Sequence, residues 1–531
     1  MNRRGFLYFI GGSACVAAQA GFARALFGEG KERRASDRVL GMYVHEGWPY
    51  NHPYAARTWT VEDWRGYAEG LKKLGYNMLI VWPALETMPQ PLTPSDRANL
   101  EKTARVIDIL HRQFGMRALV TICPNFAVNN PVARKYSFER RYLYRSSTYI
   151  NPGDPVAMGK LMKWREELLR PLAQMDGLVI IDSDPGGYPG STNDQFVNLL
   201  VLHRKLLDRL RPGIELRYWM HVGWEAYSHY YATGQFAWGT PAQAEDVLAK
   251  LKKAHIDPWG ITVHTTDTPP DLKLAEKMGL AANSLAFNYG AIEGEPSFPM
   301  TNFGGDAAFN AGATGAPGGV VGNAQTHCVQ LPNTFAFVRG AKGQPVSEAD
   351  YVQFANDLIT GQGQLLVGAW KALAGTDSKL MQSAADALAG LPAKSLTPGP
   401  LQGLLFGSPG RFRSDLVHEL RMKAAYLDFV ALSKDKVNKE GFKQFLAATK
   451  SWQGIHGYQT VWFVWPDLLE TLKKLRSPAI DRLLAETDWK RVNSIGKGNT
   501  PFERLQDFTR KWDNHTPRLI AAMEEALQNM P

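Results

Sequence analysis

Two aspartates separated by a single residue, Asp182 and Asp184, directly follow an apolar run over residues 178–181. If that run is a β-strand, the two side chains share one face, with Cα atoms about 6.6 Å apart. Two carboxylates so placed can hold different pKa values, one ionised and one protonated, which acid–base cleavage of a glycosidic bond requires. An Asp-rich turn before the following Pro-Gly-Gly sequence is the alternative. The apolar strand in front of the pair favours a catalytic function.

Side chains suited to binding a sugar follow the ends of the other apolar runs. Indole and phenol rings stack on the apolar faces of a pyranose, while imidazole, amide and carboxylate groups bind its hydroxyls. The expected substrate-binding residues are His45, Glu46, Trp48, Trp82, Asn125, Tyr188, Trp219, His221, Trp224, His264, Asp267, Asn288, Tyr289, Asn323, Gln325 and His327. Glu225 is a third candidate for the catalytic acid or base. For Trp82 and Trp219, packing in the core is an equally good interpretation.

Short apolar runs alternate with amphipathic stretches from residue 38 onward. The runs cover residues 39–44, 78–82, 118–122, 178–181, 215–220, 260–263, 284–287 and 319–322. Alternating strands and helices are typical of a parallel sheet, and eight such units predict a closed (β/α)8 barrel, a TIM-like α/β fold. Because the carboxyl ends of all strands surround one pocket in this fold, the residues named above are expected to meet there.

The seventh unit and the C-terminal third depart from this pattern. Residues 288–318 are rich in Gly and Pro and show no clear helix, so we expect the barrel to be distorted at its seventh unit. The alternation stops near Gly361, and helical patterns then follow one another without strands between them. The sequence therefore predicts a catalytic barrel over residues 38–361 and a helical C-terminal domain over residues 362–531.

Composition and charge exclude several classes of protein. The chain has 531 residues, 44% of them apolar and 21% charged, which is typical of a folded globular protein. Its net charge of +9 comes from dispersed Lys and Arg residues, so no surface that follows a nucleic acid is expected. No Gly-rich phosphate-binding motif and no Cys/His zinc spacing occurs. We therefore expect no cofactor, no metal and no nucleic-acid partner.

The first 25 residues carry the features of an export signal. Arg3 and Arg4 precede a Gly-Phe-Leu sequence and a short apolar stretch with small-x-small cleavage sites near its end. The stretch is short for a membrane span, and the paired arginines resemble a twin-arginine signal. Residues 1–25 are therefore predicted to be removed on export, leaving a periplasmic or secreted protein without stable membrane insertion. An uncleaved N-terminal anchor is the alternative.

The carboxylate pair at the end of the fourth strand, on a barrel followed by helices, resembles β-hexosaminidases, O-GlcNAcases and related enzymes that cleave N-acetylhexosaminides. In those families the first acid of the pair orients or polarises the 2-acetamido group of the substrate, and the second is the general acid/base. The resemblance implies that Asp182 orients the substrate and that Asp184 donates the proton. This chain departs from the family pattern because Ser183 separates two acids that are neighbours in those enzymes.

Other functions fit some of the same residues. Amidohydrolase-type metalloenzymes gather imidazoles from several strand ends around zinc, and this chain resembles them in having His221 after the fifth strand and His264 after the sixth. It lacks their His-x-His after the first strand, where a single histidine, His45, stands before Glu-Gly. A non-catalytic glycan-binding protein would use the same pocket. An exported redox enzyme is a further alternative that no cofactor motif supports.

Together these features predict an exported glycoside hydrolase. Its expected partner is an oligo- or polysaccharide, with an N-acetylhexosaminide as one candidate. The sequence leaves open the sugar, its anomeric configuration and the oligomeric state.

Overall fold

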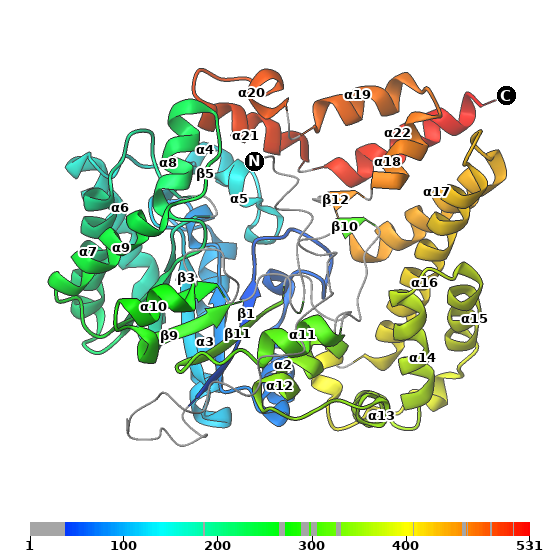
Figure 1. Ribbon diagram of the computed structural model, residues 1–531, viewed down its shortest axis with the longest axis horizontal. Coiled ribbons are helices and arrows are strands. Elements are labelled where there is room, and N and C mark those ends of the chain that lie inside the picture. Colours follow the sequence, from blue (N-terminus) through cyan, green and yellow to red (C-terminus); the bar gives the residue numbers. More distant parts are fainter. Residues whose placement is uncertain are drawn as a thin grey trace. The chain divides into compact units, whose positions relative to one another are not determined.

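Eight parallel strands close into a barrel in the computed structural model of the protein (Figure 1). The strands are β1 (Val39–His45), β2 (Met78–Trp82), β3 (Arg117–Ile122), β6 (Gly177–Ile181), β7 (Glu215–Trp219), β8 (Trp259–His264), β9 (Ser284–Phe287) and β11 (Gly319–Ala324). Each strand pairs with the one before it and the one after it in this series, and β11 pairs with β1 to close the ring. Every predicted apolar run overlaps one of these strands, so the predicted (β/α)8 fold is confirmed.

The structure describes residues 38–183, 186–264, 271–287, 292, 297–298, 305–324, 331–406, 408–458, 463–464, 466–488, 491–512 and 514–530. The signal predicted for residues 1–25 lies outside them. Val39–Pro531 forms one compact unit, and the predicted domain boundary at residue 361 stays a prediction. Among the helices described, none is both long and apolar enough to cross a membrane.

Helices follow the strands and lie on the outside of the barrel (Figure 1). They are α2 (Val61–Leu74), α3 (Pro94–Phe114), α6 (Pro155–Leu169), α7 (Asn193–Leu210), α8 (Trp224–Thr233), α9 (Pro241–Lys253), α10 (Leu272–Lys277) and α12 (Leu331–Ala341). Thr60, Thr93, Thr192 and Thr240 begin four of them with capping boxes, in which cap and third helical residue bond each other's backbone N–H. These caps determine where each loop at the carboxyl end of a strand stops.

A short helix lies in the seventh unit, where the sequence predicted none. It is α11 (Gly305–Gly312), between β9 and β11, and it packs on α12. A Cβ at Gly312 would stand 2.0 Å from the carbonyl oxygen of Phe337, and a Cβ at Gly340 would stand 2.0 Å from that of Phe309. Glycine is therefore needed at both contacts. The glycines that argued against a helix here allow two helices to approach each other closely.

Three aromatic rings show which side chains point into the barrel. Tyr43 on β1 lies 5.0 Å from Trp219 on β7, which lies 4.4 Å from Phe287 on β9, measured between ring centroids. Because β1 and β7 are not neighbours in the sheet, the Tyr43–Trp219 contact crosses the interior. Ile181 of β6 pairs with Trp219 and so points inward, whereas Ile180 faces the helices.

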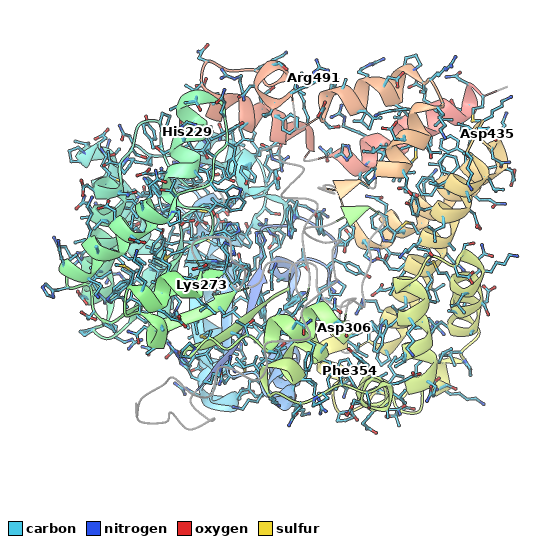
Figure 2. All side chains as sticks on the ribbon, in the orientation of Figure 1. His229, Lys273, Asp306, Phe354, Asp435 and Arg491 are labelled. Carbon is cyan, nitrogen blue, oxygen red and sulfur yellow. The ribbon has the colours of Figure 1, made fainter. Side chains whose placement is uncertain are left out.

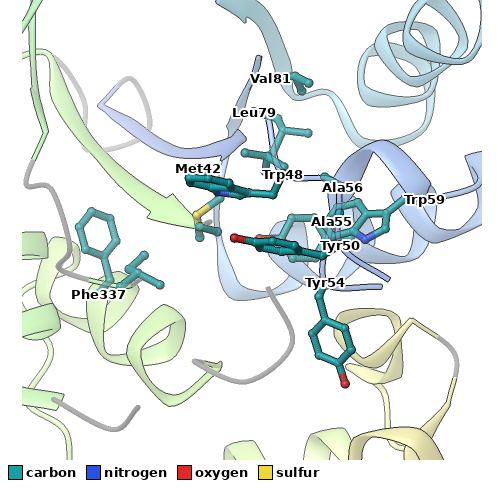
Figure 3. Packing of buried hydrophobic residues seen from close by; sticks show 14 of the residues in the cluster. Met42, Trp48, Tyr50, Tyr54, Ala55, Ala56, Trp59, Leu79, Val81 and Phe337 are labelled. Carbon is teal, nitrogen blue, oxygen red and sulfur yellow. The ribbon is translucent and has the colours of Figure 1, made fainter. Parts of the chain in front are cut away.

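The C-terminal region consists mainly of helices (Figure 1). They are α13 (Glu348–Leu358), α14 (Gly363–Ala374), α15 (Ser378–Ala389), α16 (Pro409–Leu432), α17 (Lys439–His456), α18 (Pro466–Lys473), α19 (Pro478–Glu486), α20 (Val492–Ile495), α21 (Pro501–Trp512) and α22 (His515–Gln528). The loop after β1 joins them to the barrel. In Figure 3 the rings of Trp48 and Tyr50 lie parallel, and their centroids are 5.7 Å apart. Tyr54 of the same loop donates a hydrogen bond to Asp415 on α16.

Two small sheets and a second helical contact lie outside the barrel. β4 (Phe126–Val128) pairs antiparallel with β5 (Ser147–Tyr149), flanking α4 (Asn130–Ala133) and α5 (Leu143–Ser146), and β10 (Ser297–Phe298) pairs with β12 (Phe463–Val464). α21 packs on both α5 and α8. In Figure 2, His229 marks α8, and Arg491 marks the start of the α20–α21 segment. The C-terminal helices thus reach the rim of the barrel.

Gly260 on β8 makes room for the guanidinium group of Arg217 inside the barrel. A Cβ at Gly260 would stand 2.6 Å from Nη2 of Arg217 and 2.8 Å from the carbonyl oxygen of Asn283. We expect Gly260→Ala to lower the free energy of unfolding by about 1–3 kcal/mol, as overpacking of a filled interior does. Chemical denaturation followed by circular dichroism measures the change.

The matched control is Gly368→Ala in the middle of α14, where nothing lies within 4 Å of the new Cβ. Because alanine is the better helix former, this variant should gain about 0.5–1 kcal/mol. If Gly260→Ala and the parent protein unfold at the same denaturant concentration, the packing described for the barrel interior is wrong.

Candidate active site

Six side chains point toward the barrel axis at the carboxyl ends of the strands. Alternation along each strand, together with the pairing register, places His45, Trp82, Ser183, His221, His264 and Asn323 on the inner face. The ring of His45 lies 6.3 Å from that of Tyr43, and the ring of His221 lies 6.3 Å from that of Trp219, measured between centroids. Five of the six were predicted as substrate-binding residues, and the structure brings these five together with Ser183.

Ser183, His221 and His264 form a polar cluster from three consecutive barrel strands. Ser183 Oγ lies 2.7 Å from Nδ1 of His221. Nε2 of His264 lies 2.5 Å from the carbonyl oxygen of His221, and the ring centroids of the two histidines are 5.5 Å apart. A carbonyl oxygen can only accept, so His264 carries a proton on Nε2.

Burial keeps the imidazoles of this site neutral. Loss of solvation lowers the pKa of His221 and of His264 to about 4. The same cause, helped by the charge of Arg57, lowers the pKa of His45 to about 3. Nδ1 of His45 accepts a hydrogen bond from the backbone N–H of Gly47 at 2.7 Å, so the proton of this ring is on Nε2. Each neutral ring therefore offers one donor and one acceptor.

Asp182 points away from the barrel axis and holds the turn that follows β7. Its Oδ1 accepts hydrogen bonds from the backbone N–H groups of His221 (3.1 Å) and Val222 (3.2 Å). Its Oδ2 accepts from the backbone N–H of Gly223 (3.2 Å) and from the hydroxyl of Tyr218 (2.9 Å). Burial raises the pKa of Asp182 to about 7, and these four donors act against that rise. Both oxygens of Asp182 are thus engaged by the protein itself.

Asp184, the other member of the predicted pair, lies outside the described residues. So do Asp267, Asn288, Tyr289, Gln325 and His327. At Gly186, a Cβ would stand 2.0 Å from the carbonyl oxygen of Asp182. The chain after Asp184 therefore returns to the end of β6, close to the cluster described above. The functions predicted for these six residues stay predictions.

Three predicted site residues lie against the helices. The side chain of Glu46 is buried, with its pKa raised by burial and opposed by the charges of Lys102 and Arg57. Glu225, in the first turn of α8, accepts a hydrogen bond from Gln243 of α9. Trp224 stacks on Phe196 of α7, with a centroid distance of 4.7 Å. The structure does not bring these side chains to the cluster at the barrel axis.

The remaining predicted residues lie at the rim. The indole of Trp48 is nearly parallel to the ring of His45, with centroids 5.4 Å apart. Nδ2 of Asn125 donates to the carbonyl oxygens of Ile150 and Gly187, both at 2.8 Å, and so connects the loops after β3 and β6. The ring of Tyr188 lies 4.8 Å from that of Tyr149 on β5. Trp48 is thus packed on the site, and Asn125 and Tyr188 shape the loops beside it.

Two buried charged side chains hold the end of β3 in place. Arg165 of α6 donates to the carbonyl oxygens of Cys123 and Pro124, both at 2.6 Å. Glu86 accepts from the backbone N–H of Cys123 and, at 3.2 Å, from Nε1 of Trp82. The indole of Trp82 is therefore fixed at the mouth by the same residue that anchors the neighbouring strand.

Ser183 is the site residue that sequence reasoning missed. The signal was present, because Ser183 continues the every-second-residue series of Val179 and Ile181 directly after the strand. Because acids stand on both sides of Ser183, the catalytic function was predicted for Asp182 and Asp184 instead. Alternation alone would have shown that Ser183 and Asp182 cannot both face the barrel axis.

The metal-binding alternative can be compared with these positions. His221 and His264 are adjacent, as that alternative requires, but Nδ1 of His221 and Nε2 of His264 already have partners within the protein. Within the described ranges, no group of three or more His, Cys, Asp or Glu side chains is placed to hold a metal ion.

Among known proteins, the chain resembles solved structures at low sequence identity. No protein-family model matches the chain, and no curated protein matches it. Similar solved structures include a GH138 enzyme targeting pectin rhamnogalacturonan II, with 10% identity over 82% of this chain and 62% of that one (TM-score 0.45). An O-GlcNAc hydrolase from Thermobaculum terrenum has 10% identity over 86% and 98% (TM-score 0.41). A family 89 glycoside hydrolase from Clostridium perfringens has 9% identity over 92% and 63% (TM-score 0.43).

The chain spans less than two thirds of the length of the GH138 and family 89 chains. Barrels of this kind support many reactions. The reaction of this protein has to be argued from its own residues.

The neutral histidines predict how stability depends on pH. An unfolded chain binds protons on histidine near pH 6.5, whereas folded His221 and His264 resist protonation down to about pH 4. Between these values the two histidines favour the unfolded chain, whereas Asp182, whose folded pKa is raised to about 7, favours the folded one. We therefore expect the histidine contribution to lower the melting temperature as the pH is lowered from about 6.5 to about 4. Scanning calorimetry across this range measures it.

His221→Gln removes one of these groups and should show a smaller decrease in melting temperature over the same range. The exposed histidine of α8, His229, supplies the matched control, His229→Gln (Figure 2). An unchanged pH dependence in His221→Gln would show that His221 is not held neutral by folding.

Proposed function

We propose that the protein is a glycoside hydrolase that binds its saccharide at the carboxyl ends of the barrel strands. The observation that carries the proposal is the set of inward-facing side chains, namely three imidazoles, an indole, a hydroxyl and an amide beside a floor of aromatic rings. A sugar presents apolar ring faces and hydroxyls that both donate and accept. The inward-facing set matches both features.

The protonation state of the histidines supports a hydroxyl-bearing substrate over an anionic one. Positive imidazolium groups would attract phosphate or carboxylate, but burial holds His45, His221 and His264 neutral at pH 7. A neutral imidazole next to a hydroxyl can serve as donor through one nitrogen and as acceptor through the other. This is the chemistry that distinguishes one sugar hydroxyl from its epimer.

Asp184 is the proposed general acid. It follows Ser183 directly and precedes the segment that returns to the end of β6. In this proposal Asp184 gives its proton to the glycosidic oxygen as the bond to the leaving sugar breaks. Asp182 enters as a positioning residue because its oxygens hold the turn after β7. An N-acetylhexosaminide is the saccharide to test first.

We expect Asp184→Asn to lower turnover of a glycoside with a poor leaving group by about 10²-fold or more, because the leaving oxygen then departs without a proton. An aryl glycoside whose leaving group needs no proton should be affected less. Released sugar, measured by chromatography over a panel of glycosides with and without a 2-acetamido group, gives both values.

Asp208→Asn, at an exposed carboxylate of α7, is the matched control and should retain parental turnover. Near-parental turnover in Asp184→Asn would reject Asp184 as the acid. Activity that disappears in chelator would instead favour the metal-dependent alternative. Binding of glycan without any product from the parent protein would favour the glycan-binding alternative.

We also propose that the protein is exported by a twin-arginine signal. The support is the Arg3-Arg4 pair ahead of the apolar stretch and the small-residue cleavage sites. Replacing both residues, Arg3→Lys with Arg4→Lys, should keep the precursor in the cytoplasm of a bacterial host. Cell fractionation and the mass of the mature N-terminus measure this outcome. Equal export of the variant and the parent would contradict the proposed route.

A further inference from the structure

The loop after β1 caps the C-terminal end of α17 in the helical region. The last carbonyl groups of an α-helix have no N–H partner within the helix and need one from outside. Nδ2 of Asn51 donates to the carbonyl oxygens of Gly454 (3.3 Å) and Ile455 (3.1 Å). The backbone N–H of Asn51 donates to the carbonyl oxygen of His456 at 3.0 Å. One residue after β1 therefore satisfies the last three residues of α17.

The end of α17 has room for the side chain of Asn51 because a glycine follows the helix. Gly457 adopts the left-handed region, with a φ of 66°, and its N–H donates to the carbonyl oxygen of Gln453. A Cβ at Gly457 would stand 2.4 Å from Cγ of Asn51. Both the backbone angle and the side chain of Asn51 therefore require glycine at this position.

A series of aromatic rings connects this cap to the mouth of the barrel. The ring of Tyr458, which directly follows Gly457, lies 4.5 Å from that of Tyr50. The ring of Tyr50 lies 5.7 Å from that of Trp48 (Figure 3), and Trp48 lies 5.4 Å from His45 at the end of β1, measured between centroids. Trp48, Tyr50 and Tyr458 are all buried. Because a packed interior transmits displacement, a shift of the helix end would move Trp48 relative to His45.

We propose that the helical region positions Trp48 beside His45 through the cap made by Asn51, so that Asn51 is a positioning residue of the saccharide site. This inference rests on the proposed function, because His45 belongs to the proposed saccharide site and Trp48 packs on it. It gives the C-terminal helices a function, which is to fix one of the loops at the carboxyl ends of the strands. Asn51 acts through this loop and has no contact with the sugar.

Asn51→Asp is the sharpest test, because it keeps the size of the side chain and removes the donor. Its carboxylate would face carbonyl oxygens at the negative end of the α17 helix dipole. In hydrogen-exchange mass spectrometry of the full chain, we expect backbone exchange over residues 48–54 to rise about tenfold or more, since this substitution removes two hydrogen bonds of the cap.

Asn438→Asp is the matched control at the other end of the same helix. Oδ1 of Asn438 accepts a hydrogen bond from the N–H of Gly441 at 2.7 Å, and a negative charge is favourable at a helix N-terminus. This variant should retain the parental exchange over residues 48–54.

The position of Trp48 has a spectroscopic signature that needs no substrate. Its indole lies at 22° to the imidazole of His45, so the ring current of the indole shifts the Cε1–H resonance of His45. Protein labelled with ¹³C at Cε1 of histidine reports this resonance, which is assigned by its loss in His45→Gln. We expect the His45 signal to move in Asn51→Asp and to keep its parental position in Asn438→Asp.

Kinetics separate positioning from a general loss of stability. A partly unfolded variant contains less active enzyme, which lowers the measured kcat and leaves KM unchanged, whereas a misplaced binding residue raises KM. We expect Asn51→Asp to raise KM for the glycoside about tenfold with a change in kcat of less than about twofold.

A substitution on the helical side tests the same connection without changing the loop. Gly457→Ala places a methyl group against the side chain of Asn51 and should also raise KM and the exchange over residues 48–54. The matched control is Gly115→Ala, because Gly115 ends α3 in the same left-handed region, with a φ of 57°, and nothing lies within 4 Å of its Cβ position. Both variants carry the same kind of backbone strain, but Gly115→Ala should keep the parental KM and exchange.

The outcomes separate this inference from the proposed function. A parent protein that cleaves no glycoside rejects the proposed function, while exchange and the His45 signal still test the connection between helix and loop. An active parent whose Asn51→Asp variant keeps the parental His45 signal and KM overturns the inference alone. Equal effects of Gly457→Ala and Gly115→Ala on KM would also overturn it. If Asn51→Asp does not fold, Asn51→Ala, which adds no charge, replaces it in every measurement.

Discussion

The alternation of side chains along parallel strands is the constraint on which the site depends. In a closed barrel, consecutive residues must point to opposite sides, one toward the axis and one toward the helices. At the end of β6 this rule sends Ser183 inward and Asp182 outward, where Tyr218 and the turn after β7 supply its partners. The acid nearest to the strand is thereby removed from direct contact with a ligand. It binds the backbone N–H of His221 instead.

Buried charged groups at the strand ends reinforce this arrangement. Arg165 binds carbonyl oxygens after β3, Arg57 binds the carbonyl oxygen of Glu46 after β1, and Asp182 binds N–H groups after β7. The backbone at these points leaves the sheet and loses its ladder partners, so a buried charge that satisfies it stabilises the loop. In each case the arginine donates to carbonyl oxygens and the aspartate accepts from N–H groups.

The sequence predicted the architecture more completely than the site. The eight apolar runs are local signals, and each was confirmed as a strand. The helix α11 was missed because its glycines are explained by a contact with α12, which a single sequence does not show. The histidines of the site were predicted because they follow the ends of the apolar runs. To predict Ser183, one must know the direction of its side chain. To predict Arg165, one must know which helix covers which strand.

The neutral histidines link the fold to the kind of ligand that the site can bind. A neutral buried imidazole offers a donor at one nitrogen and an acceptor at the other, and each needs a partner of matching direction. A hydroxyl can supply it by turning its O–H bond, whereas a ligand without a polar group there would leave the imidazole unpaired in a dry site. Discrimination by a missing hydroxyl is therefore stronger than discrimination by an added methyl group. In the proposed saccharide site, the aromatic floor of Tyr43, Trp219 and Phe287 would contact a ring face of the sugar, and the imidazoles beside it would bind its hydroxyls.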